Sequence, residues 1–315
     1  MRKPLKFVKE IEVVSKAKID GFEVLFLRVN IEPAENLLTL REATEKGLVE
    51  VTEVSASGLI NAIQLNNKSD KFVVCFRGDI LVGGKQNRTL VTTIIVSPKS
   101  VVRIPVTCVE RGRWSLTTRE MKQRFKAPQM LRVVSLMEEI SLPKRSDLVR
   151  KRMRVIQHSV WHEVSRRLAI LDIPSETYDA TTLLIRDQKD VEQKIQIPDG
   201  VNGLLFVHDG DIVGGEIYGI DVPKELIKES IISAYIDYLY YKRQEIKISS
   251  KIHSIKDLSK SLSKSKVKRK DSLFDEEAFV VKSDNIDGLL ICHLNHPVFF
   301  EFIAKEIFPD DFIYT

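Results

Sequence analysis

Apolar and polar residues alternate with a period of two through much of the first 110 residues, which indicates strands that bury one face. Asp20-Gly21 separates two such runs and predicts a hairpin between Ile11 and Asn30. Further alternating runs between Leu48 and Thr107 are divided by clusters of glycine, asparagine, serine and proline, the residues that favour turns. This part of the chain is therefore predicted to form strands at sandwich-like spacing.

The pattern changes to a helical period after Trp114. Apolar residues recur at intervals of three and four between Ser146 and Leu171, and Pro174 lies just beyond the end of this predicted helix. Pro223 occupies a good starting position for another helix. We therefore predict an α+β fold with a β-sandwich-like, mainly antiparallel core and packed helices.

The last third of the chain has a different composition. Lys242 to Asp271 is rich in lysine and serine and nearly lacks aromatic residues, which favours a mobile linker or arm. Beyond it we predict strands at Phe279 to Val281 and Leu289 to Cys292, and a final helix from Pro297 to Ile307. The predicted parts are a composite core over 1–241, a basic linker or arm over 242–275, and a C-terminal part over 276–315 that packs on the core.

Composition limits the classes of protein that the chain can belong to. Its 315 residues, 43% of them hydrophobic, suffice for one or two domains, and a formal net charge of +5 is too small to establish a polyanionic partner. Cys75, Cys108 and Cys292 lie far apart and are expected to be reduced core residues. No run approaches the ~20 apolar residues that span a bilayer, so we expect a cytoplasmic protein without a membrane partner.

Two polar clusters interrupt the β-rich stretch from Val73 to Trp114. The first is GGKQNR, from Gly83 to Arg88, and the second is ERGRW, from Glu110 to Trp114. The strands that carry them are expected to be neighbours, so their polar ends are expected to share one surface. Glycine lets backbone N–H groups form a concave anion site, to which Lys85 and Arg88 add charge. A surface hairpin whose polar residues satisfy their own turn is the alternative.

The helix predicted after Ser146 carries a second stripe beside its apolar face, with Arg150, Gln157 and Trp161 at helical intervals. This stripe either faces the same pocket as the clusters or is a solvated cationic face. The candidate ligand-binding residues are Gly83, Gly84, Lys85, Gln86, Asn87, Arg88, Glu110, Arg111, Arg113, Trp114, Arg150, Gln157 and Trp161.

The sequence leaves the identity of any catalytic residue unknown. The GGKQNR spacing matches neither the phosphate loop of nucleotide triphosphatases nor a dinucleotide fingerprint. Glu110 suits either a general base or an ion-pair partner that holds a neighbouring arginine in place. His158 and His162 are four residues apart on the predicted helix, but no third ligand has a supporting spacing. We therefore expect no metal and no cofactor.

The clusters also belong to a longer motif. It comprises Gly78 to Arg88, Ile104 to Val106 and Cys108 to Trp114, and continues more weakly through Arg150, Gln157, Trp161 and Gly210 to Gly219. These residues resemble the signature of the ARPP-1 domain family over roughly Leu48 to Tyr240. That family is named for its association with ADP-ribosylglycohydrolase and rhodanese-phosphatase proteins. The resemblance implies a link to nucleotide or ADP-ribose metabolism and supplies no catalytic residues.

Two functions are compatible with these observations. The first is binding of a phosphorylated or nucleotide-like ligand of the ADP-ribose type in a cationic pocket, with or without a reaction. The alternative is a non-enzymatic protein that binds RNA or the ribosome through the basic segment from Lys251 to Lys270, with a homodimer as one assembly. The location of bound anions distinguishes the two.

Overall fold

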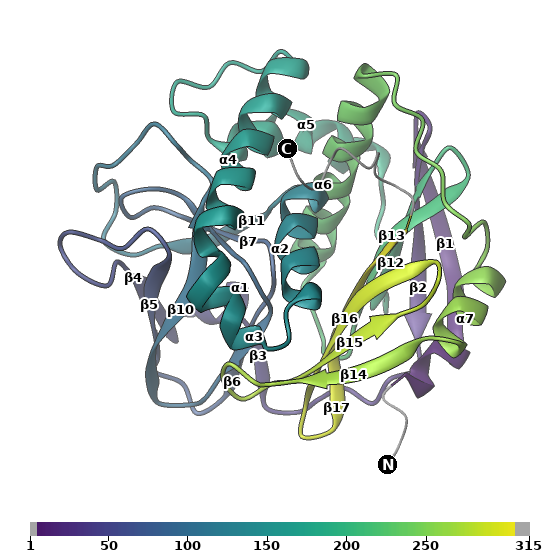
Figure 1. Cartoon of the computed structure of the whole chain (residues 1–315), viewed down its shortest axis with the longest axis horizontal. Coiled ribbons are helices and arrows are strands. Elements are labelled where there is room, and N and C mark those ends of the chain that lie inside the picture. Colours follow the sequence, from purple (N-terminus) through teal and green to yellow (C-terminus); the bar gives the residue numbers. More distant parts are fainter. Residues whose placement is uncertain (1–4, 306–315) are drawn as a thin grey trace. The chain divides into compact units, whose positions relative to one another are not determined.

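The fold of this chain is described by a computed structural model over residues 5–305. The chain forms two compact units, shown as ribbons in Figure 1. Unit 1 comprises residues up to 35, 188–271 and those from 277 onward, and unit 2 comprises 36–187 and 272–276. Both units combine helices with sheets whose strand pairs are mostly antiparallel, which confirms the predicted α+β class. The division differs from the boundaries that the sequence suggested.

Unit 1 is built on a sheet whose strand order is β1-β2-β12-β13-β17-β16-β15-β14, with every neighbouring pair antiparallel. Its strands are β1 (Ile11–Ile19), β2 (Phe22–Val29), β12 (Gly203–His208), β13 (Asp211–Tyr218), β14 (Lys266–Lys270), β15 (Glu277–Lys282), β16 (Ile286–His293) and β17 (His296–Ala304). Its helices include η1 (Lys6–Glu10), α6 (Lys224–Arg243) and α7 (Ile255–Ser263). Asp20 has a positive φ of 55°, as expected for the predicted β1–β2 hairpin.

Unit 2 contains one sheet with the order β11-β7-β8-β10-β5-β4 and another with the order β3-β6-β9. Its strands are β3 (Leu37–Thr39), β4 (Val49–Thr52), β5 (Ala62–Asn67), β6 (Phe72–Cys75), β7 (Asp79–Val82), β8 (Arg88–Leu90), β9 (Ile94–Val96), β10 (Ser100–Cys108) and β11 (Lys122–Lys126). Its helices are α1 (Leu40–Glu45), α2 (Gln129–Ser141), α3 (Arg145–Asp147) and α4 (Met153–Ile170), and α5 (Ala180–Lys194) begins in it. Apolar side chains from both sheets meet in one core, which fixes the strand ends that carry the polar clusters.

The helix predicted from Ser146 is present with a different beginning. A π-helical turn, η2 (Leu148–Arg152), lies between α3 and α4. The apolar stripe from Met153 to Leu168 is buried as predicted. A wider i→i+5 turn changes the angular position of the residues around it, and Arg150, which lies in that turn, is exposed.

The predicted C-terminal helix is wrong. The described part of that segment is strand β17, paired with β13 and β16, and the prediction beyond residue 305 lies outside the described residues. Val298, Phe299 and Phe300 are all buried, so the segment has no exposed face to set a helical or strand period. Pairing with two neighbouring strands decides its structure, because aromatic and β-branched residues pack well in a buried sheet.

The basic segment from Lys242 to Asp271 contains regular structure where the sequence favoured a loop. Ser254 caps α7 by accepting a hydrogen bond from the backbone N–H of Asp257 at 3.2 Å. Leu258 and Leu262, one turn apart on α7, are both buried. Strand β14 follows and pairs with β15. Burial of two leucines and strand pairing at the edge of a sheet therefore order this stretch, although its composition favoured a mobile linker or arm.

The three cysteines are free and buried, in agreement with the predicted core positions of Cys75, Cys108 and Cys292. Within residues 5–305, none of the helices combines the length and the apolar character that crossing a bilayer requires.

Candidate functional site

The two polar clusters meet at one end of the larger sheet of unit 2. Residues 83–87 connect β7 to β8, and residues 110–114 follow β10. Strands β8 and β10 are antiparallel partners, with Arg88 opposite Cys108. The first residue of one strand is therefore beside the last residue of the other, and the predicted proximity of the clusters is confirmed.

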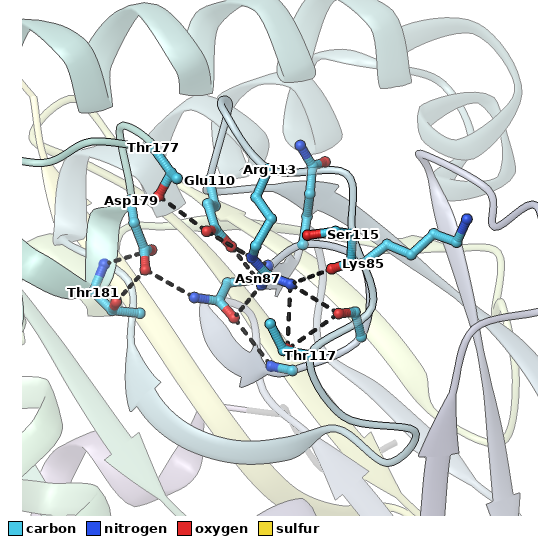
Figure 2. Close-up of polar contacts among 12 residues, drawn as sticks. Lys85, Asn87, Glu110, Arg113, Ser115, Thr117, Thr177, Asp179 and Thr181 are labelled. Atoms are coloured by element: carbon cyan, nitrogen blue, oxygen red, sulfur yellow. Dashed lines mark hydrogen bonds and ion pairs between the residues drawn. The ribbon is translucent and has the colours of Figure 1, made fainter.

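Arg113 joins the two clusters (Figure 2). Its Nε and Nη2 donate to the two carboxylate oxygens of Glu110 at 2.8 and 2.6 Å. Its Nη1 donates to the backbone carbonyls of Gly84 at 2.8 Å and Ser115 at 2.9 Å. A two-point contact between a guanidinium and a carboxylate fixes orientation as well as distance. Glu110 thus fixes the orientation of the Arg113 guanidinium.

Each carboxylate oxygen of Glu110 already accepts two hydrogen bonds. Besides Arg113, it accepts hydrogen bonds from the backbone N–H of Asn87 and from the hydroxyl of Thr177, each at 3.0 Å. Burial would raise the pKa of Glu110, but the hydrogen bonds from Arg113 and Asn87 and the charge of Arg113 outweigh it and hold the pKa below its ordinary value. The geometry therefore favours the ion-pair alternative over a general base.

Asn87 extends the network to a segment that the sequence did not single out. Its side-chain oxygen accepts from the N–H of Gly83 at 3.0 Å, and its amide donates to Asp179 at 2.9 Å. Asp179 directly precedes α5 and accepts from the N–H of Thr181 at 3.0 Å, which is the arrangement of an N-cap. An aspartate just before a helix is a recognisable signal, but nothing local to it indicates Asn87 as its partner.

Close backbone packing holds the same segment in place. The N–H of Gly112 donates to the carbonyl of Thr177 at 2.8 Å. A Cβ atom on Gly112 would lie 2.9 Å from the Cα of Thr177, closer than such atoms approach in folded proteins. The glycine within ERGRW therefore permits this contact.

Arg88 is enclosed by protein groups. Its side chain has no exposed surface, and its guanidinium donates to Gln86 at 3.1 Å, to the carbonyl of Leu59 at 3.3 Å and to the sulfur of Cys108. Glu53 lies 3.5 Å away as its ionic partner. Arg88 and Arg113 thus flank the same loop, but each is paired with a carboxylate. The partner of Arg88, Glu53, was not among the predicted site residues.

The candidates on the helix have three different environments. Gln157 is buried and both accepts from the N–H of Cys108 at 2.8 Å and donates to its carbonyl at 3.0 Å, so it fastens α4 to β10. Trp161 is partly buried, with the guanidinium of Arg111 5.7 Å from its ring centroid. Arg150 is exposed and makes no hydrogen bond or ion pair to a residue within 5–305. The structure does not bring Arg150 into the cluster.

Three exposed or partly exposed groups remain at the surface of the cluster. Trp114 is 45% exposed. The Lys85 ammonium lies 5.6 Å from its ring centroid, and the Lys85 side chain extends away from the hydrogen-bond network (Figure 2). Arg111 is exposed. Within the described part of the chain, neither Lys85 nor Arg111 has a carboxylate within ion-pair distance.

Replacing Arg113 with lysine is expected to lower the free energy of unfolding of unit 2 by about 1–3 kcal/mol, because a lysine cannot reproduce the planar fork that joins the two clusters. Urea unfolding followed by tryptophan fluorescence measures this, since Trp114 and Trp161 both lie in unit 2. Arg111→Lys is the matched control and should cost less than about 0.5 kcal/mol. Equal losses in the two variants would contradict the role of Arg113.

The fold and the cluster define an α+β protein with a loop site anchored by ion pairs. Its sequence matches the model of the ARPP-1 family, the ARG and Rhodanese-Phosphatase-superfamily-associated Protein domain, over residues 10–298. The chain belongs to this family, and the match extends beyond the span from Leu48 to Tyr240 into both units. Neither the curated proteins nor the solved structures compared with the chain include a match.

Proposed function

We propose that the surface formed by Lys85, Arg111 and Trp114 binds a phosphorylated, nucleotide-like ligand of the ADP-ribose type. The observation that carries this proposal is an exposed indole with an ammonium 5.6 Å from its ring centroid and without a carboxylate partner among the described residues. The family name adds support, because it links the domain to ADP-ribosylglycohydrolase proteins by association.

The charges of the cluster favour an anionic ligand. Arg113 is paired with Glu110, and Arg88 with Glu53, so these two cations are largely compensated within the protein. Lys85 and Arg111 are not. An ammonium without a carboxylate beside it attracts phosphate as a point charge, and a guanidinium binds phosphate through two parallel hydrogen bonds.

The indole favours a ligand that also has a planar ring. A nucleobase that stacks on an aromatic side chain contributes about 1–3 kcal/mol, whatever the base. A nucleoside diphosphate or ADP-ribose offers a ring and phosphates within one molecule, so it can use Trp114 and Lys85 together. Inorganic phosphate can use only the cations.

The loop that carries Lys85 is held in place by hydrogen bonds within the protein. Gly84 has a φ of +58°, a left-handed conformation that glycine adopts without strain, and its carbonyl accepts from Arg113. The N–H of Lys85 itself donates to Glu53 at 2.9 Å. A loop that is already ordered loses less conformational entropy on binding, which favours affinity.

The proposal concerns binding, and it assigns no reaction. Glu110 is occupied by four donors from Arg113, Asn87 and Thr177. Burial raises the pKa of the Cys108 thiol to about 11 despite the nearby Arg88, so the thiol is neutral near pH 7 and a poor nucleophile.

Titration with ADP-ribose and with inorganic pyrophosphate tests the proposal. We expect Lys85→Gln to raise the Kd of both probes about tenfold or more, because a charge-assisted contact is lost. Trp114→Leu is expected to raise the Kd of ADP-ribose about tenfold and to leave pyrophosphate unchanged. Lys71→Gln, at an exposed lysine of the same unit, is the control. ADP-ribose binding that survives both site substitutions, or a wild-type protein that does not bind it, would refute the proposal.

A further inference from the structure

A second concentration of positive charge surrounds a hollow of about 490 Å³ in unit 1. The hollow is bordered by α7, the start of β14 and the turn between β15 and β16. Its lysines, among the described residues, are Lys251, Lys260, Lys264, Lys266 and Lys282. They come from separate elements, so the fold rather than a local run of sequence brings them together.

The arrangement places like charges in unfavourable positions. Lys266 and Lys282 are direct partners across β14 and β15, and like charges opposite each other in a sheet are destabilising. Lys260, in the last turn of α7, and Lys264, its C-cap, are four residues apart, a spacing at which like charges also repel. An anion in the hollow would relieve both repulsions.

Protein carboxylates offset these charges only in part: Asp257 interacts with Lys260, and Asp287 lies opposite Lys282 across β15 and β16. Lys264, Lys266 and Lys282 form no ion pair with any residue in the described part of the chain. Asp257 borders the hollow, but its carboxylate accepts from the hydroxyl of Ser254 at 2.7 Å as part of the start of α7. Asp284 also borders it and is exposed. Lys264, Lys266 and Lys282 therefore keep the described lining of the hollow positively charged.

Protection of the sheet edge explains only part of the pattern. Lysines on an edge strand discourage pairing with another sheet, and β14 is an edge strand that contains Lys266. Lys260 and Lys264 are in the last turn and at the C-cap of α7, and Lys282 is on β15, which is paired on both sides. Edge protection therefore does not account for these three lysines.

We infer that this hollow is a binding site for a compact polyanion with several phosphate groups in a row. Its volume falls within the range of small-molecule pockets. Its neutral lining includes Ser261 and Asn285, which are joined by a hydrogen bond of 3.2 Å. The described residues that line it include no aromatic side chain on which a base would stack. Single-stranded RNA is normally bound by such stacking in an extended groove, so a small polyphosphate fits better.

Inorganic tripolyphosphate is the probe that tests this inference in the full chain. We expect the double variant Lys264→Gln/Lys266→Gln to raise its Kd about tenfold or more at 0.1 M salt. The control is Lys16→Gln/Lys194→Gln, which removes the same charge at exposed lysines of unit 1 outside the hollow. It should change the Kd less than twofold. Without the probe, the pocket variant should also have an unchanged or higher Tm, because repulsion is removed.

Three results would overturn the inference. Equal weakening in both double variants would show a diffuse attraction to positive charge. Weakening by Lys85→Gln without weakening by the pocket variant would assign tripolyphosphate to the site in unit 2. Binding of a uridine dodecamer that depends on Lys264 and Lys266, without binding of tripolyphosphate, would identify a nucleic-acid surface like the one considered from the sequence.

Discussion

Replacing Glu139 with glutamine is expected to lower the free energy of unfolding of unit 2 by about 3–5 kcal/mol. Glu139 lies on α2, and its carboxylate accepts hydrogen bonds from the guanidinium groups of Arg77 and Arg145. Arg145 also donates to Glu276. The side chains of Arg77, Arg145 and Glu139 have no exposed surface, so water cannot replace a lost partner.

The charge of Glu139 is what holds this network together. Burial alone would raise the pKa of Glu139, but the charges of Arg145 and Arg77 outweigh it and hold the pKa below the ordinary value. Neutralising the carboxylate removes a negative charge that both buried guanidinium groups contact, while Arg145 keeps its ion pair with Glu276. An uncompensated buried charge costs far more than a lost surface pair.

The neighbouring residue provides the control for this experiment. Glu138 pairs with Arg152 at 3.4 Å on the surface, with the arginine side chain 45% exposed. Glu138→Gln should therefore change the stability by less than about 1 kcal/mol. Urea unfolding followed by tryptophan fluorescence reports on unit 2 for both variants. Similar losses for Glu138→Gln and Glu139→Gln would contradict the importance of the buried network.

Acid is expected to destabilise unit 1 through His208, a buried histidine. His208 on β12 lies between aromatic rings, with centroids 5.3 Å from Tyr238 and 5.8 Å from Phe22. Neither ring nitrogen has a hydrogen-bond partner among residues 5–305. Burial lowers the pKa of His208 from 6.5 to about 3, because the charged ring would have no solvent or partner.

The sign of the pH effect follows from this lowered pKa. Between pH 6.5 and about pH 3 the unfolded chain binds a proton at His208 that the folded chain excludes. Stability is therefore fully present above pH 6.5 and falls with acidification at about 1.4 kcal/mol per pH unit over that window. We expect His208→Phe to remove this contribution while retaining a ring against Phe22 and Tyr238.

Urea unfolding of unit 1, followed by the circular dichroism of its tyrosines at pH 7, 6, 5 and 4, measures this slope. His158→Phe makes the same change at an exposed position and should leave the slope as in the wild type. An unchanged slope in His208→Phe would show that another group causes the acid sensitivity.

Features that depend on residues close together in the chain were predictable from the sequence. The Asp20-Gly21 hairpin needs a positive φ at one position, and Asp20 adopts it. The buried stripe of α4 repeats every three or four residues. The meeting of the two polar clusters follows from pairing of nearby strands, in which Arg88 and Cys108 are only 20 residues apart. Local sterics and periodicity act over such distances, so the features that they determine can be predicted from the sequence.

Features that depend on which distant side chains meet were decided by the tertiary structure. Arg88 was predicted to face a ligand, but Glu53, 35 residues earlier, pairs with it inside the protein. Thr177 lies 67 residues from Glu110, and Glu276 lies 131 residues from Arg145. A guanidinium has the same sequence signature whether it meets a phosphate or a carboxylate. Packing alone determines which of the two is within reach, because charge compensation in a buried site requires contact within a few ångströms.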